Sequence, residues 1–87
     1  MNRYFILFGK KDDNIYYVCN TNPILWSPII QQAKIYTDRY TAEYAVLRDW
    51  YNFRHISDNI DNGSLDSFWI SIMENGIEIE KIKLLGE

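Results

Sequence analysis

Cysteine is almost absent from this chain, and long apolar runs are absent altogether. The 87 residues include one cysteine, Cys19, so no disulfide can form within the chain, which is typical of proteins in reducing compartments. The apolar run near the N-terminus spans only Tyr4 to Phe8, which is too short for a signal-peptide core or a membrane span. We therefore expect a cytosolic protein without membrane contact.

Basic residues are few and form no run. Twelve acidic residues outnumber nine basic ones, giving a net charge of −3. Lys and Arg are scattered along the sequence, so we expect no direct binding to the nucleic-acid backbone. Aromatic side chains stack on single-stranded bases where basic residues surround them, and stacking on a sheet face therefore stays open as an alternative.

Motifs for catalysis, phosphate binding and metal binding are also missing. The chain contains no Gly-rich phosphate loop, no Gly-x-Ser-x-Gly and no metal-ligand spacing. The only histidine, His55, is expected at a helix end, where its charge would interact favourably with the helix dipole. Cys19 is expected to be an inert strand thiol. We therefore expect a protein that is not an enzyme and has neither cofactor nor metal.

Apolar and aromatic residues are abundant. They make up 47% and 16% of the chain, which is enough for one domain over residues 1–87 with a dense core. Residues 3–8 and 15–19 read as strands of a hairpin around a polar turn at 9–14. Residues 20–32 hold two prolines and read as a loop pinned by Leu25 and Trp26, with one helical turn after Pro28. Residues 33–36 read as a short strand.

A second hairpin is predicted at the C-terminus. Residues 67–73 alternate, with Phe68, Ile70 and Ile72 facing inward, and Asn75-Gly76 is a strong type I′ turn signal. Residues 77–84 return as the last strand. Their apolar phase includes Ile77 and Ile79 first and then slips by one residue, which predicts a β-bulge at residues 80–81.

Between the hairpins, Thr37 or Asp38 should cap a helix that runs to residue 53. Helical spacing gives a first apolar stripe of Ala42, Val46, Trp50 and Phe53, and a second of Tyr40, Tyr44, Leu47 and Tyr51. Together the stripes cover an arc of roughly 200°, against roughly 100° or somewhat more for a helix on one sheet face. The predicted fold is α+β, with about five antiparallel strands and one main helix on one face.

The surplus apolar surface of this helix indicates a partner. Tyr and Trp are enriched where protein surfaces meet, because they offer large contact area and few rotatable bonds. The alternative is that the acidic loop 56–66 and the loop 20–32 cover the tyrosines. The candidate partner-binding residues are Tyr40, Tyr44, Trp50, Tyr51, Asp58, Asp61 and Asp66. A homodimer through the tyrosine face is compatible with this reading.

The layout is similar to that of small accessory proteins from phages of low-GC bacteria. The similarity lies in Trp26, in the segment Ala33-Lys-Ile-Tyr-Thr-Asp38 and in the early helical Ala42. The long acidic loop 56–66 and the aromatic density of the helix depart from that pattern, and no functional residue carries over. The resemblance implies a protein that binds and blocks a host protein, such as a CRISPR–Cas effector, in the host cytosol.

Our leading hypothesis is therefore a non-enzymatic protein-binding module, a phage or mobile-element inhibitor of a bacterial defence protein. The alternative is a domain that binds or sequesters a small ligand such as a nucleotide signal. Basic residues converging on a concave site would favour the alternative.

Overall fold

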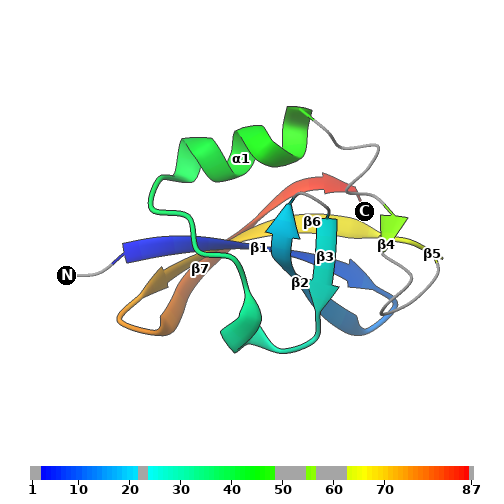
Figure 1. The fold of residues 1–87 in the computed structure, drawn as a ribbon, viewed down its shortest axis with the longest axis horizontal. Helices are drawn as coiled ribbons and strands as arrows, with labels where there is room; N and C mark the ends of the chain where they lie inside the picture. Colours follow the sequence, from blue (N-terminus) through cyan, green and yellow to red (C-terminus); the bar gives the residue numbers. More distant parts are fainter. Residues whose placement is uncertain (1–2, 22–23, 49–54, 57–62, 87) are drawn as a thin grey trace.

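Seven strands, one α-helix and one 3₁₀ turn form the described part of the chain (Figure 1). The computed structural model describes residues 3–21, 24–48, 55–56 and 63–86. The first half contains β1 (Arg3–Lys11), β2 (Asn14–Thr21), β3 (Ile24–Ser27), η1 (Ile30–Gln32) and α1 (Arg39–Arg48). The second half contains β4 (His55–Ile56), β5 (Gly63–Ser64), β6 (Ser67–Glu74) and β7 (Ile77–Gly86).

The main sheet has five antiparallel strands in the order β3-β2-β1-β6-β7. The N-terminal and C-terminal hairpins thus join through β1 and β6, which pair from Arg3↔Glu74 to Lys10↔Ser67. With α1 above this sheet, the α+β prediction is confirmed (Figure 1). Both hairpins lie where the sequence placed them, although β1 and β2 extend further into the expected turn.

The central position of β1 explains its continuous apolar run. Ile6, Leu7 and Phe8 are all buried although successive side chains point to opposite faces. Both faces of β1 therefore need apolar residues. One face carries Phe5 and Leu7 into the main core, and the other carries Ile6 and Phe8.

The fifth strand differs from the one expected. The predicted strand at 33–36 is reduced to a single bridge between Tyr36 and Phe5, and the segment 24–27, expected as a loop, forms β3. The β1–β2 ladder runs only from Phe8 to Lys11, and the bridge lies on the same edge of β1 beyond its end. Phe5 N donates to Tyr36 O at 2.8 Å, and Lys34 N donates to Val18 O at 2.7 Å, so the segment ties β1 to β2. The expected helical turn after Pro28 is confirmed as η1.

The C-terminal hairpin turns at Asn75 and Gly76, whose φ values of 54° and 82° confirm the predicted type of turn. The bulge predicted at 80–81 lies instead at Ile79, and a second bulge lies at Leu84. These shifts keep Ile82 opposite Ile70 in the core face. The expectation that Ile77 and Ile79 face inward is wrong, because both are exposed on an edge strand.

The predicted loop 56–66 is wrong at its ends, because His55 and Ile56 in β4 pair with Ser64 and Gly63 in β5. Two residues per strand leave no alternation in the sequence to predict this ladder. The sequence also predicts helix over residues 49–53, and these lie outside the described residues.

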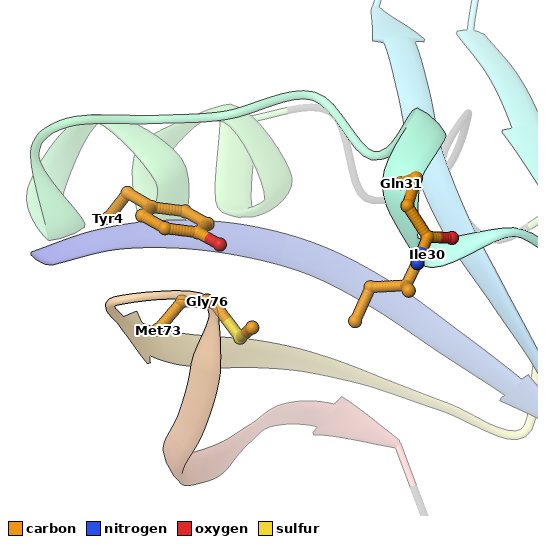
Figure 2. A pocket seen from close by; sticks show the side chains of 5 residues that line it. All are labelled: Tyr4, Ile30, Gln31, Met73 and Gly76. Atoms are coloured by element: carbon orange, nitrogen blue, oxygen red, sulfur yellow. The ribbon is translucent and has the colours of Figure 1, made fainter. Parts of the chain in front are cut away.

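The two faces of the main sheet have different covers. The main core lies between α1 and the sheet and includes Trp26, Phe68 and Ile70. η1 lies on the opposite side of the sheet from α1 (Figure 1). There it borders a cleft of about 230 Å³ lined by Tyr4, Ile30, Gln31, Met73 and Gly76 (Figure 2). No helix in the described part of the chain is long and apolar enough to cross a membrane.

Candidate functional site

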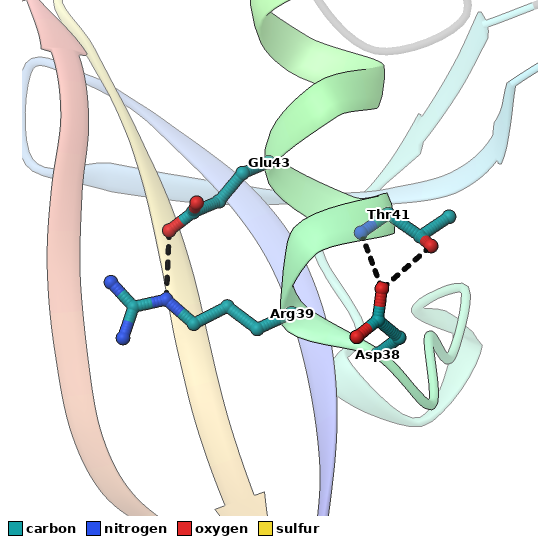
Figure 3. Close-up of polar contacts among 4 residues, drawn as sticks. All are labelled: Asp38, Arg39, Thr41 and Glu43. Atoms are coloured by element: carbon teal, nitrogen blue, oxygen red, sulfur yellow. Dashed lines mark hydrogen bonds and ion pairs between the residues drawn. The ribbon is translucent and has the colours of Figure 1, made fainter.

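The start of α1 is fixed by Asp38. Its Oδ2 accepts hydrogen bonds from the backbone N of Thr41 at 2.9 Å and from Thr41 Oγ1 at 2.8 Å (Figure 3). The hydrogen bond from the Thr41 hydroxyl, followed by the one from its backbone, lowers the pKa of Asp38 below its ordinary value. Of the two caps that the sequence left open, Thr37 and Asp38, the structure therefore has Asp38.

Two tyrosines lie one turn apart on the solvent side of α1. The ring centroids of Tyr40 and Tyr44 are 6.5 Å apart with an interplanar angle of 10°, and the Arg48 guanidinium carbon lies 5.8 Å from the Tyr44 centroid. Tyr40 is 74% exposed, Tyr44 54% and the neighbouring Leu47 58%. Both tyrosines are therefore mostly exposed, and Leu47 is as exposed as they are. We call Tyr40, Tyr44, Leu47 and Arg48 the tyrosine face.

The opposite side of α1 is narrow and made of small residues. Ala42 and Val46 are fully buried against the core, as the first predicted stripe requires. Because their side chains are short, α1 lies close to β1 while its larger side chains remain outside. An ion pair between Arg39 Nε and Glu43 Oε1 at 2.7 Å flanks the tyrosine face (Figure 3).

Asp66, the one predicted acidic contact among the described residues, does not join the tyrosine face. Asp66 lies between β5 and β6, and its Oδ2 accepts a hydrogen bond from the backbone N of Asp12 at 2.7 Å. It therefore closes the β1–β2 turn, at the end of the sheet away from the start of α1 (Figure 1). Trp50, Tyr51, Asp58 and Asp61 lie outside the described residues.

A second surface lies on the sheet face turned away from α1. Tyr17, Phe8, Trp69 and Lys83 are in register across β2, β1, β6 and β7. Phe8 and Trp69 stack with centroids 6.0 Å apart and planes within 5°, and Phe8 lies 6.0 Å from Tyr17 at 53°. Trp69 Nε1 donates to Ser67 Oγ at 2.8 Å, which fixes the orientation of the indole.

Three lysines surround the Trp69 ring. The Nζ atoms of Lys10, Lys83 and Lys81 lie 4.8, 5.5 and 5.6 Å from its centroid. Within the described ranges, the ion pairs join Arg3 to Glu74 and Arg39 to Glu43, and none involves these lysines. We call Phe8, Tyr17, Trp69, Lys10, Lys81 and Lys83 the lysine–tryptophan face.

One carboxylate shares this side of the sheet. Glu78 accepts a hydrogen bond from the buried Ser71 hydroxyl. Burial, with a smaller contribution from the nearby Glu78 charge, raises the pKa of Tyr17 above its ordinary value. Tyr17 therefore stays a neutral phenol at physiological pH.

The two candidates for nucleophilic chemistry lie in different strands. Cys19 is a half-buried thiol in β2, and His55 lies in the short strand β4 rather than at a helix end. Among the described residues, no three His, Cys, Asp or Glu side chains gather as metal ligands. None of the described residues that line the cleft beside η1 is basic, so they do not supply the feature that would favour a nucleotide-signal pocket.

Sequence reasoning missed the lysine–tryptophan face. The signal in the sequence is that three strands carry aromatic or basic residues at alternate positions, on the side opposite to the core residues. These positions are Phe8-x-Lys10, Ser67-x-Trp69 and Lys81-x-Lys83. The pairing of β1 with β6 and β6 with β7 is needed to bring those positions together. Comparison of the chain with family models, with curated proteins and with solved structures finds no match.

Proposed function

We propose that this protein is a non-enzymatic binding module that docks on another protein through its tyrosine face. The observation that supports the proposal is the exposed, mutually stacked pair Tyr40 and Tyr44 with Leu47 beside it on a well-capped helix. Aromatic residues and Arg are enriched at the centres of protein interfaces, and Arg48 adjoins the pair.

The tyrosine pair is suited to binding because it is already ordered. Stacking restricts both rings before a partner arrives, so less side-chain entropy is lost when they are covered. Neither ring contributes much to the core, since Ala42 and Val46 hold the helix to the sheet. A second copy of this chain is one partner that could cover the tyrosine pair, and measurement of the mass in solution tests for the homodimer.

We further propose that the partner is a bacterial defence protein, such as a CRISPR–Cas effector, and that the chain acts as a phage or mobile-element inhibitor. This narrower proposal is supported by the resemblance in layout to phage accessory proteins. It is also compatible with a small domain that presents an aromatic surface.

Phage infection assays test the inhibitor proposal. The protein is expressed in paired bacterial strains that differ only in one defence system, across a panel that includes CRISPR–Cas systems. We expect it to restore phage plating in a defended strain and to change nothing in its undefended pair.

Two variants locate the activity. Tyr40→Ala with Tyr44→Ala should abolish the rescue while the protein stays folded. Ile77→Ala, which truncates an equally exposed apolar side chain on β7, should retain it. If the protein rescues infection in no strain of the panel, the inhibitor proposal is wrong. If the tyrosine variant rescues like the parent protein, the assignment of the surface is wrong.

A further inference from the structure

We infer that the lysine–tryptophan face is a binding site for single-stranded nucleic acid, separate from the tyrosine face on α1. The inference goes beyond the proposed function, and it reverses the expectation drawn from the scattered basic residues. In the fold, three of the nine basic residues of an acidic protein converge on one indole.

The three lysines of this site form no ion pair with the described residues. Lys10, Lys81 and Lys83 come from two strands on either side of β6. Three ammonium groups around one ring repel one another, so an anion placed among them would be stabilised by all three. The attraction to the indole face offsets part of this repulsion.

The rings beside the lysines favour bases over other anions. Trp69 is half-buried, and its plane is held by Ser67 and by stacking on Phe8, so the ring is oriented before any ligand binds. Tyr17 extends the row of rings onto β2. Aromatic rings on a sheet stack on unpaired bases while neighbouring cations contact the phosphates. The carboxylates of an acidic peptide would pair with the lysines but would make no stacking contact with the ordered indole.

The shape of the site favours a strand over a free nucleotide. Sites for small ligands are concave and enclose most of the ligand surface. This site is a row of side chains across four strands rather than a cavity. Lys81 and Lys83 are exposed, Trp69 and Tyr17 are half-buried, and Phe8 is buried between their strands. The cleft on the same side of the sheet is lined by other residues. Such a row suits a chain that makes several weak contacts at once. Duplex bases are already stacked on each other and are less available to the rings.

Fluorescence anisotropy with labelled dT15 and rU15 at low salt tests the inference. We expect binding to at least one of these strands, and weaker binding to a duplex of the same length. If each lysine neutralises one phosphate, the logarithm of the association constant should fall with the logarithm of the salt concentration with a slope of roughly −2. Lys81→Gln alone should reduce that slope by about 0.7.

Matched variants separate the site from general charge effects. The triple variant Lys10→Gln, Lys81→Gln, Lys83→Gln should lose binding. Lys34→Gln should keep it, because Lys34 also lies over an aromatic ring, Tyr36, but belongs to the segment before α1. Trp69→Leu, verified as folded by circular dichroism, should weaken binding about tenfold or more.

Several outcomes would overturn the inference. They are no binding of either strand at low salt, unchanged affinity in the triple variant, or equal loss in Lys34→Gln. Equal affinity for polyglutamate would assign the site to acidic peptides, and equal affinity for UMP or dTMP would assign it to free nucleotides. If Trp69→Leu does not fold, Trp69→Phe replaces it. The inference would also be overturned if Trp69→Phe leaves the affinity unchanged and Lys81→Gln leaves the slope of the salt dependence unchanged.

Discussion

Tyr40 and Tyr44 stack on each other one turn apart, with their ring planes within 10°, while both remain mostly exposed. Two residues further along the same helix, Val46 is fully buried. One short helix thus separates residues that stabilise the fold from residues that remain available for contact.

This separation predicts opposite effects of truncation. Tyr40→Ala and Tyr44→Ala should each change the free energy of unfolding by no more than about 0.5 kcal/mol, because exposed side chains lose little on truncation. Val46→Ala should cost about 2 kcal/mol, since it removes two buried methyl groups and leaves a cavity. Urea unfolding of the three variants measures both effects. A large loss in the tyrosine variants would show that these residues belong to the core and would remove the basis for a binding surface.

Asp38 predicts a stability change in acid. Its folded pKa is lowered by the hydrogen bonds from Thr41, so its contribution is complete above the unfolded pKa of about 3.9 and is lost as the pH falls through the folded pKa. Asp38→Ala should therefore be less stable than the parent protein at pH 7, and the difference should shrink as the pH falls below about 4.

Asp38→Asn serves as the control for that titration. Asn caps helices about as well as Asp and does not ionise, so its stability relative to Asp38→Ala should not narrow over the same range. Thermal unfolding at several pH values gives both comparisons. A constant difference between the parent protein and Asp38→Ala down to pH 3 would contradict the role of the carboxylate.

Gly9 and Leu65 are predicted to be energetically coupled. A Cβ at Gly9 would lie 2.5 Å from Leu65 Cδ1, and Leu65 is buried. Gly9→Ala should therefore cost about 1–3 kcal/mol by displacing Leu65 from the core. Leu65→Ala removes the clash, so the double variant should lose less stability than the two single variants combined. Additivity within about 0.5 kcal/mol in urea unfolding would show that the close approach has no energetic effect.

Much of the fold could be predicted from residues that are neighbours in the sequence. The two hairpins, the Asn75-Gly76 turn and the cap at Asp38 each depend on neighbouring residues, and all are present. β3 was missed because prolines at 23 and 28 made the segment look like a loop, although the strand fits between them. The predicted bulge was misplaced and the one at Leu84 was not predicted, because register depends on both strands of the pair.

The tyrosine face could be predicted from the sequence, and the lysine–tryptophan face could not. Tyr40 and Tyr44 are four residues apart on one helix, so their meeting follows from helical spacing. Lys10, Trp69 and Lys83 meet only because β1 and β6, which are far apart in the sequence, are neighbours in the sheet. Composition and charge counts contain no information on that pairing.

The most direct test of the binding-module proposal is a quantitative pull-down from lysates of bacteria carrying candidate defence systems. Tagged parent protein, Tyr40→Ala with Tyr44→Ala, and Ile77→Ala are compared side by side by mass spectrometry, with folding verified for each. We predict one stoichiometric host protein with the parent protein and with Ile77→Ala, reduced at least tenfold with the double tyrosine variant. Retention of the same partner by the folded tyrosine variant, or no partner in any lysate, would contradict it.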